Sequence, residues 1–278
     1  MNEPDWRAFA RMALEEDRAH NDVTTDLLGD DASRRVTGRF IAEGEFVVVG
    51  LPMIRAVFAE LGDVDVTTGR CVEGDWVEAG DVIATAVGAA RNLLGGERVA
   101  LNYLQRLSGI ATETRQALQY VAGFETAIVD TRKTTPGLRA LEKYAVRVAG
   151  GVNHRFSLED AVLWKDNHWA LLAASGRKLV DVLASAPGNV PVQVEVERED
   201  QLRVVIDAGV RFVLLDNQSP ETIARWARAL GPNVTIEASG GITAENARAY
   251  AEAGVHRISM GTLTHSVAAV PITFAVDV

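Results

Sequence analysis

The sequence predicts an α/β fold in which a barrel of parallel strands follows a smaller N-terminal α+β domain. Beyond residue 124, short apolar runs that end in polar or Gly residues alternate with stretches of helical spacing, which is the pattern of βα units and a parallel sheet. These runs are residues 127–129, 161–164, 190–196, 212–215, 234–236 and 257–260. Because they repeat on one rhythm, we expect a closed barrel rather than an open sheet. Before residue 110 the rhythm differs, so the domains are expected to cover residues 1–109 and 110–265.

The first domain is expected to begin with a helix, two strands and a second helix. Residues 6–16 place apolar side chains on one side at helical spacing. Residues 36–49 indicate strands around Gly44. Residues 51–61 indicate a helix that Pro52 opens at its first turn and Gly62 ends.

Residues 71–88 alternate short apolar pairs with Gly-Asp turns, which is typical of hairpins. The stretch resembles the small β-hammerhead of biotin and lipoyl carriers. No lysine lies between Val72 and Val87 to take a prosthetic group, so we expect a covering sheet and no carrier role. Residues 92–121 are then expected to be helical, with an interruption around Ser108 and Gly109.

Composition limits the function. The 278 residues are 47% hydrophobic and 24% charged, as in soluble globular proteins, and the formal net charge is -10. An acidic chain argues against a general nucleic-acid surface. Cys71 is the only cysteine, which excludes an internal disulfide and a Cys-cluster metal site. We expect no membrane span and no signal peptide, and hence a cytoplasmic protein.

Basic residues gather between Asp130 and His168. This stretch holds seven Lys/Arg and two His against five Asp/Glu, within an acidic chain. Several of these cations follow strand-like runs, and active sites of such barrels lie at the carboxyl ends of the strands. Positive charge at strand ends predicts a pocket for a small polyanion.

Residues that could bind a ligand or take part in a reaction follow almost every predicted strand. They are Asp130 with Arg132 and Lys133, then Lys165, Glu195, Asp216, Ser239 with Gly240 and Gly241, and Gly261. Along residues 190–197 valines alternate with polar residues, so Glu195 is expected to point into the barrel mouth. The alternative is an edge strand with one solvated face.

Two glycine-containing strand ends are candidate phosphate sites. Ser239, Gly240 and Gly241 precede a helix that Thr243 is expected to cap, and Gly261 follows the next strand. Backbone N–H groups at such turns bind phosphate, often after the last strands of a barrel. Taken alone, the Ser-Gly-Gly turn is equally compatible with a plain tight turn.

Several blocks together resemble the quinolinate phosphoribosyltransferase family, from about Asp17 to the C-terminus. The blocks include DTRKTTPG at 130–137, GGVNHR at 150–155, KDNH at 165–168, ER at 97–98, LSGIAT at 107–112, LDN at 215–217, EASGG at 237–241 and LTHS at 263–266. The resemblance implies an N-terminal α/β domain, joined by the C-terminal tail 266–278, and an incomplete barrel of about seven strands. The segment around His154 is the candidate for the strand beyond the six runs.

The resemblance also implies a reaction. Quinolinate attacks C1 of phosphoribosyl pyrophosphate, pyrophosphate leaves and carbon dioxide is lost, which gives nicotinate mononucleotide. Mg²⁺ is the implied cofactor, and a homodimer is implied because Arg98 matches an arginine that reaches in from the partner subunit.

By matching position, quinolinate is expected to contact six residues: Arg98, Arg132, Lys133, His154, Arg155 and Lys165. Lys133, Lys165, Glu195 and Asp216 are the expected catalytic residues. Glu195 and Asp216 are also expected on the ribose and Mg²⁺ side, with the metal held through water. The phosphoribosyl phosphate is assigned to Ser239, Gly240, Gly241, Gly261 and His265, of which His265 is equally compatible with a structural role.

Some features leave alternatives open. Arg139, Lys143 and Arg147 share one helical face, which predicts a solvated surface, although one of them could touch substrate. Ala149 and Trp169 depart from the family pattern and put only loop shape in doubt. A related phosphoribosyltransferase with another acceptor, such as the molybdenum-associated paralogue, and a non-catalytic phosphosugar-binding protein are the alternative functions.

Overall fold

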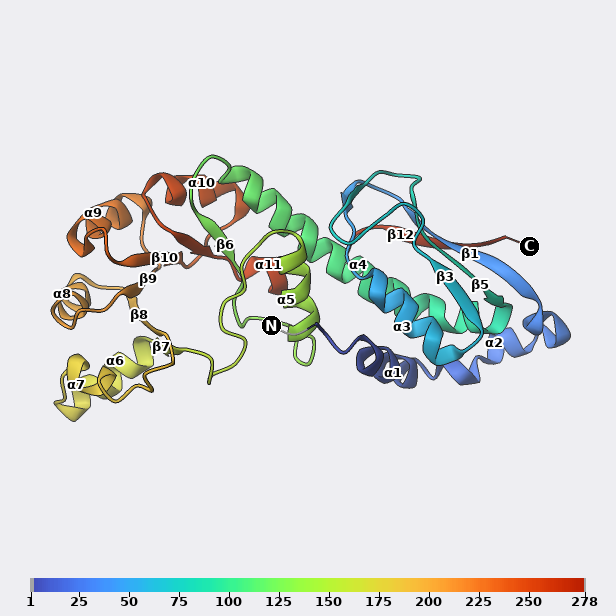
Figure 1. Ribbon diagram of the computed structural model, residues 1–278, viewed down its shortest axis with the longest axis horizontal. Coiled ribbons are helices and arrows are strands. Elements are labelled where there is room, and N and C mark those ends of the chain that lie inside the picture. The colour runs from blue at the N-terminus through green and yellow to red at the C-terminus, as the bar shows by residue number, and fades with distance from the viewer. Residues whose placement is uncertain (1–2, 278) are drawn as a thin grey trace. The chain divides into compact units, whose positions relative to one another are not determined.

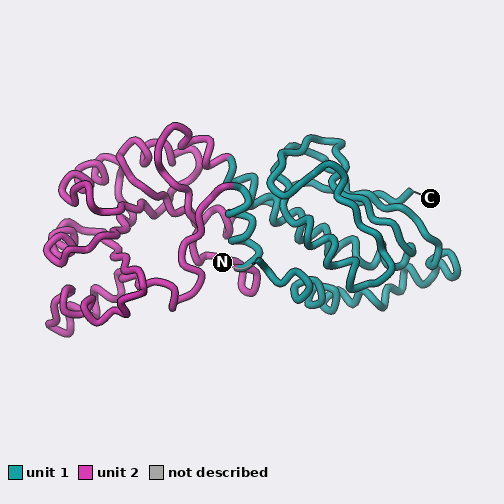
Figure 2. The backbone as a smooth tube through the Cα atoms, in the orientation of Figure 1, with its two compact units in different colours: residues 1–115, 140–149, 267–278 teal, residues 116–139, 150–266 magenta. Residues whose placement is uncertain are grey.

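The computed structural model describes residues 3–277, which form two compact units (Figure 2). Unit 1 comprises residues 1–115, 140–149 and 267–278, and unit 2 comprises residues 116–139 and 150–266. Each unit has its own sheet: an antiparallel one in unit 1 and a parallel one in unit 2.

The main sheet of unit 1 has the order β12-β1-β5-β3. Its strands are β1 (Arg35–Ala42), β3 (Val64–Thr67), β5 (Val82–Ala89) and β12 (Ile272–Asp277). Every second residue of β1 is buried, as expected of a strand with one face on a core. The C-terminal strand β12 pairs along β1 from Thr37 opposite Asp277 to Ala42 opposite Ile272, so the end of the chain completes a sheet whose other strands lie before residue 90.

Helices pack with this sheet in unit 1. The longer ones are α1 (Trp6–Asp17), α3 (Leu51–Leu61), α4 (Ala90–Tyr120) and α5 (Arg139–Val148), with the short α2 (Val23–Asp26) and two 3₁₀ turns at 19–21 and 29–33. The Asp5 side chain caps α1 by accepting from Ala8 N–H, and Pro52 lies in the first turn of α3. Phe40 and Phe58, both fully buried, meet in the core.

The parallel sheet of unit 2 has the order β6-β11-β10-β9-β8-β7, and its helices connect successive strands (Figure 1). The strands are β6 (Ala127–Val129), β7 (Val162–Trp164), β8 (Val192–Val196), β9 (Phe212–Asp216), β10 (Thr235–Ser239) and β11 (Arg257–Ser259). The helices are α6 (Asp166–Ser175), α7 (Leu179–Leu183), α8 (Glu199–Asp207), α9 (Pro220–Leu230), α10 (Ala244–Glu252) and α11 (Thr262–His265). Parallel pairing brings all the carboxyl ends to one edge.

The expectation of a closed barrel is wrong, whereas the incomplete α/β barrel implied by the family resemblance is confirmed. Within the described chain the sheet stays open between β6 and β7. The segment before His154 contributes only a single parallel bridge, from Val152 to Val129, so the sheet has six strands rather than about seven. Val152 exchanges backbone bonds with Ile128 and Asp130, after which the chain turns away from the sheet.

Two local expectations in unit 1 are wrong. Residues 71–88 do not form a hairpin, because β4 (Trp76–Val77) pairs with β2 (Phe46–Val47) while β5 pairs with β1 and β3. The helix α4 runs without a break through Ser108 and Gly109. The Ser108 hydroxyl bonds the backbone of Val49, and Gly109 faces the Ala268 carbonyl, so this pair marks close backbone approach and not a helix end.

The prediction of a solvated face for residues 139–148 is also wrong. Lys143 and Glu142 are fully buried, and only Arg147 of the three basic residues is exposed. Arg106 of α4 lies 2.9 Å from the Glu142 carboxylate. A helix packed on both sides can bury charged side chains when each has a partner, which its spacing alone does not reveal.

No described helix is long and apolar enough to cross a membrane.

Gly109→Ala is expected to destabilise the protein although alanine favours helices. A Cβ at this position would overlap the Ala268 carbonyl oxygen, so the free energy of unfolding in urea should fall by about 1–3 kcal/mol. Gly188→Ala, in open space with an ordinary φ, serves as the control and should change it by less than about 0.5 kcal/mol. A Gly109→Ala protein as stable as the wild type would contradict this packing.

Candidate active site

A cavity of 370 Å³ lies at the carboxyl ends of the strands of unit 2. Its lining comprises Thr131, Arg132, Lys133, His154, Arg155, Leu163, Lys165, Glu195, Leu214, Asp216, Glu237, Ser239 and Ser259. The cavity therefore gathers eight of the residues expected from the sequence: Arg132, Lys133, His154, Arg155, Lys165, Glu195, Asp216 and Ser239. We call it the barrel-mouth cavity.

The segment that follows β6 carries Arg132 and Lys133. Thr264 of α11 donates its hydroxyl to the Lys133 carbonyl at 2.8 Å, and the Thr131 hydroxyl accepts from Lys133 N–H. Asp130, fully buried, accepts from the Asn153 side chain at 2.6 Å and from His154 N–H at 2.8 Å. These bonds hold the two cation-bearing segments together.

Arg132 and Arg155 are close enough to repel. Burial lowers the pKa of Arg155, the charge of Arg132 lowers it further, and Asp160 partly opposes both. The Arg155 fork also donates to the Ala161 carbonyl at 2.8 Å, just before β7. The Nε atoms of both arginines are buried without an acceptor among the described residues. Buried donors of this kind indicate a missing anionic partner.

Lys165 and Glu195 form an ion pair in the cavity. Lys165 Nζ lies 2.8 Å from Glu195 Oε2, and Glu195 is 4% exposed. Lys165 directly precedes α6, where its N–H donates to His168 Nδ1 at 2.9 Å. Burial raises the pKa of Glu195; Lys165 lowers it in part, and the charge of Asp216 raises it.

Three carboxylates form the acidic side of the site. One oxygen from each of Glu195, Glu197 and Asp216 lies within 4.8 Å of the others. Glu197 is absent from the sequence-based candidates, although it follows from the same alternation that directs Glu195 inward. Three carboxylate oxygens that close suit a hard divalent cation such as Mg²⁺, with water or phosphate completing its shell.

Glycines shape the backbone beyond β9 and β10. Gly240 and Gly241 both have positive φ, of 95° and 62°, and Asn217 opposite them has a φ of 55°. A Cβ on Gly240 would come within 2.7 Å of Asn217 N. Asn217 N–H donates to the Ser239 carbonyl at 2.9 Å. A tight glycine turn that leaves N–H groups free beside Ser239 suits a phosphate.

The remaining candidates lie outside the lining of the cavity. Gly261 follows β11, and a Cβ there would lie 2.9 Å from His265 Nε2 and 3.0 Å from Lys133 Cδ. His265 Nδ1 is 2.6 Å from the Ser266 hydroxyl. Arg98 lies on α4 in unit 1 with its side chain 60% exposed, and Glu97 is 4.0 Å away.

His154 and Arg139 make contacts that the sequence did not indicate. His154 Nε2 lies 3.0 Å from Gln193 Oε1, inside the sheet, and 3.5 Å from Glu237 Oε1. Arg139 donates to the Thr134 hydroxyl at 3.1 Å and to the Phe156 carbonyl at 3.0 Å, so it ties the loops after β6 and before β7. Arg139 does not line the barrel-mouth cavity.

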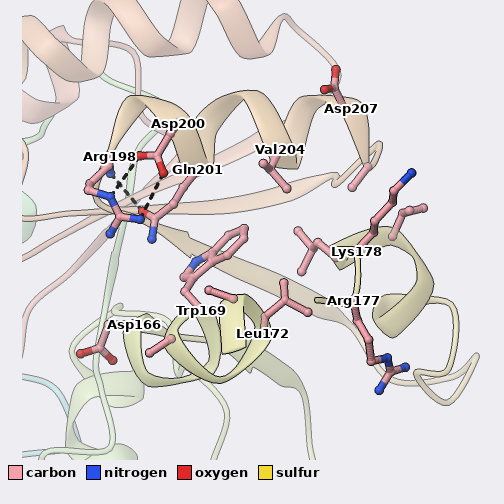
Figure 3. Close-up of a pocket in the computed structure, with 15 residues that line it drawn as sticks. Asp166, Trp169, Leu172, Arg177, Lys178, Arg198, Asp200, Gln201, Val204 and Asp207 are labelled. Atoms are coloured by element: carbon pink, nitrogen blue, oxygen red, sulfur yellow. Dashed lines mark hydrogen bonds and ion pairs between the residues drawn. The ribbon is translucent and has the colours of Figure 1, made fainter. Parts of the chain in front are cut away.

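A second cavity, of 760 Å³, lies between α6, α7 and α8 (Figure 3). Leu172 and Val204 line it, and Arg198 at its rim is paired with Asp200 at 3.0 Å. Its wall includes Trp169, whose Nε1 donates to the Glu195 carbonyl at 2.8 Å. Trp169 thus supports the strand end that carries Glu195, and the larger cavity contains none of the expected site residues.

Family models match both parts of the chain. The model for the quinolinate phosphoribosyl transferase N-terminal domain matches residues 22–108, and that for the C-terminal domain matches residues 110–275.

Relatives and solved structures agree with these models. A probable nicotinate-nucleotide pyrophosphorylase [carboxylating] from Bacillus subtilis is 41% identical, over 94% of this chain and 90% of its own length. The Mycobacterium leprae nicotinate-nucleotide pyrophosphorylase [carboxylating] is 40% identical, over 94% and 93%. The Ehrlichia chaffeensis nicotinate-nucleotide pyrophosphorylase structure superposes with a TM-score of 0.91 at 31% identity and covers 100% of both chains. NadC from Streptococcus pyogenes gives 0.88 at 35% identity, covering 96% and 95%.

The titration of Glu195 should depend on its two charged neighbours. Because Asp216 raises the pKa of Glu195 and Lys165 lowers it, Asp216→Asn should move that pKa down and Lys165→Met should move it up. Carbon-detected NMR of labelled glutamate carboxyls measures both shifts. Glu221, whose pKa is lowered by Ser219, is the internal control and should keep its value. A Glu195 pKa that rises in Asp216→Asn would contradict the arrangement.

Proposed function

The chain belongs to the quinolinate phosphoribosyl transferase family, and we propose on that premise that the barrel-mouth cavity is the active site. The enzyme transfers the phosphoribosyl group of phosphoribosyl pyrophosphate to quinolinate with decarboxylation, a step of NAD biosynthesis. The observation that carries the assignment to this cavity is the convergence of Arg132, Lys133, Arg155 and Lys165 on it in an acidic protein.

The reaction exchanges one bond at the ribose and one at the pyridine ring. The ring nitrogen of quinolinate bonds to C1 of the ribose as the bond from C1 to pyrophosphate breaks. The 2-carboxylate then leaves as carbon dioxide, and its bonding electron pair stays on ring carbon 2, which takes up a proton. The products are nicotinate mononucleotide, pyrophosphate and carbon dioxide.

The acceptor side is assigned to the cations. Arg132 and Arg155 each offer a planar fork that matches a carboxylate, and two adjacent carboxylates balance two like-charged forks. Their acceptor-free Nε atoms and the pKa of Arg155, lowered by burial and by Arg132, support an anionic ligand between them. Lys133 and Lys165 complete the cation set beside the phosphates, since both line the same cavity.

The donor side is assigned to the carboxylates and the glycine turns. Glu195 and Asp216 line the cavity, and they would favour positive charge on the ribosyl ring as pyrophosphate leaves, as carboxylates do in glycosyl transfer. Ser239, Gly240 and Gly241 suit the 5-phosphate through backbone N–H groups. Gly261 and His265 extend this end, where Gly261 gives both Lys133 and His265 room to approach.

Decarboxylation depends more on how bound quinolinate is oriented than on the cations that hold it. Cations that hold the 2-carboxylate also oppose its departure, so the driving force comes from the pyridinium that N-ribosylation creates. That positive ring nitrogen stabilises the electron pair left on carbon 2. The protein then contributes positioning and charge stabilisation.

Mg²⁺ fits the acidic side. Glu195, Glu197 and Asp216 would hold it, partly through water. When bound, the ion would neutralise charge on the pyrophosphate.

A homodimer with Arg98 shared between subunits is the proposed assembly. Arg98 is exposed on α4, where the Glu97 carboxylate lies 4.0 Å from its guanidinium. An exposed guanidinium in the matching family position suits a partner's acceptor site. A cytoplasmic location is proposed as well, since the single Cys71 is a free thiol, as is usual in a reducing compartment.

Purified protein incubated with quinolinate, phosphoribosyl pyrophosphate and Mg²⁺ should form nicotinate mononucleotide, and Arg155→Met should lower kcat/KM by about 100-fold or more because a buried fork is lost. Product is followed by chromatography. Turnover of another base, with none of quinolinate, would replace this function by that of a related phosphoribosyltransferase. Binding of phosphoribosyl pyrophosphate without any turnover would favour a non-catalytic phosphosugar-binding protein.

Arg98→Ala and Lys165→Ala should each be inactive but complement one another on mixing. If Arg98 acts across the interface, a heterodimer keeps one intact site, so random exchange restores about one quarter of wild-type activity. Arg132→Ala mixed with Lys165→Ala is the matched control and should stay inactive, because both residues belong to the same chain's cavity. With subunit exchange verified by mass spectrometry, failure of the first pair would exclude the shared site.

A further inference from the structure

A polar cluster, which we call the relay, adjoins the acceptor cations in unit 2, where Glu237 and Ser259 also line the barrel-mouth cavity. Glu237 of β10 is fully buried. Its Oε1 accepts from the Ser259 hydroxyl and lies 3.5 Å from His154 Nε2, and its Oε2 lies 2.9 Å from Arg257 Nε. The four side chains come from two strands, β10 and β11, and one loop, so their meeting is a product of the fold.

His154 is held in one protonation state by its own backbone. Its Nδ1 accepts a hydrogen bond from Arg155 N–H at 2.8 Å, which leaves no room for a proton on that nitrogen. This bond favours the neutral ring with its proton on Nε2, which lies 3.0 Å from the acceptor Gln193 Oε1. Since the neighbour that donates to Nδ1 is Arg155, the state of this ring is coupled to the position of an acceptor cation.

Glu237 would favour the opposite state if it stood alone. A buried carboxylate 3.5 Å from an imidazole stabilises the imidazolium. Arg257 prevents this by supplying the counter-charge from the other side. The Arg257 side chain is only 24% exposed, and its guanidinium lies over the Phe212 ring, 5.3 Å from the ring centre, so it is held in place.

Other charged groups surround the relay at greater remove. Asp130, which directly follows β6, accepts from His154 N–H, Asp160 lies near Arg155, and Arg132 faces Arg155. Lys133, Lys165, Glu195 and Asp216 line the same barrel-mouth cavity as His154. Arg257, Gln193 and Asp160 line a separate cavity of 210 Å³, which His154 and Arg155 also adjoin.

We propose that Arg257 is a positioning residue of the acceptor site: by neutralising Glu237 it keeps His154 uncharged, and so keeps Arg155 where it binds the acceptor dicarboxylate. The proposal deepens the proposed function and rests on it for the identity of the acceptor. His154 then organises the site through its two ring nitrogens and adds no positive charge of its own.

Loss of Arg257 has a definite consequence. Glu237 would be left buried with a hydroxyl and a neutral imidazole, a costly state for a carboxylate. His154 and Glu237 would then take up a proton as the pH falls through the imidazole range. A proton on Nδ1 breaks the bond from Arg155 N–H, and Arg155 is displaced.

Nitrogen NMR of the histidine rings tests the relay without substrate, and so separately from the reaction. The chain has five histidines, and His154→Gln assigns the signal. In the wild type His154 should show a protonated Nε2 and a bare Nδ1 throughout about pH 6–8. Arg257→Leu should introduce a titration of His154 in that range. His168, whose Nδ1 also accepts a backbone N–H, is the matched control, and its ring signals should be the same in Arg257→Leu as in the wild type.

Steady-state kinetics then separates positioning from general damage. In Arg257→Leu the KM for quinolinate should rise at least about tenfold between pH 8 and pH 6, while the KM for phosphoribosyl pyrophosphate changes less than about twofold. Arg257→Lys should restore most of the wild-type profile. The double variant Arg257→Leu/Glu237→Gln should also lose the added titration, because the charge that drives it is gone.

Several results would overturn the proposal. They are a His154 that is imidazolium in the wild type near pH 7, an Arg257→Leu protein whose His154 does not titrate, and a double variant that keeps the titration. If Arg257→Leu does not fold, Arg257→Gln replaces it with the same expected outcomes. If the NMR results hold and quinolinate is not turned over, the relay stands and the proposed function fails.

Discussion

The site depends on holding two guanidinium groups, those of Arg132 and Arg155, beside one small cavity. Burial and mutual repulsion both disfavour this arrangement, as the lowered pKa of Arg155 records. The fold offsets the cost with neutral and anionic acceptors: the Ala161 carbonyl holds the Arg155 fork, and Asp130 holds the backbone before it. The Nε of each arginine remains a donor without an acceptor, and the oxygens of a dicarboxylate can supply the acceptors.

The open sheet makes this arrangement possible. Because β6 and β7 do not pair within residues 3–277, the chain between Val152 and Ala161 crosses the gap as a loop and places His154 and Arg155 at the strand ends. The same gap lets side chains from β8 and β10 meet His154, and Arg257 of β11 pairs with Glu237 beside it. A closed barrel would fill that space with apolar layers. Incompleteness of the barrel is thus part of how the acceptor cations are positioned.

Many residues of the barrel-mouth cavity could be predicted from the sequence, because the carboxyl ends of parallel strands lie at the same edge of a sheet. The residue that ends a strand faces the mouth, which placed Lys165, Asp216 and Ser239, and alternation along β8 placed Glu195. The same alternation predicts that Gln193 and Glu197, two residues before and after Glu195, share its face of the strand. In the structure Gln193 contacts His154, and Glu197 joins the carboxylate group.

Other features depend on contacts between distant segments, which no local pattern encodes. Gly109 looks like a helix breaker until the Ala268 carbonyl is seen beside it. Lys143 looks like a surface residue because spacing does not show that its helix is packed on both sides. The tautomer of His154 depends on Arg155 N–H, one residue away, together with Gln193 and Glu237, which are far along the chain.

The most direct test of the central claim is to measure, by calorimetry, the affinities of the protein for quinolinate and for nicotinate. Quinolinate carries two adjacent carboxylates and nicotinate only one, so a cavity built around paired cations should bind quinolinate at least about 100-fold more tightly, equivalent to about 2.7 kcal/mol. Arg132→Met should reduce that preference to about tenfold or less. Equal affinity of the wild-type protein for both ligands would contradict the account, because it would mean that the paired arginines do not recognise the second carboxylate.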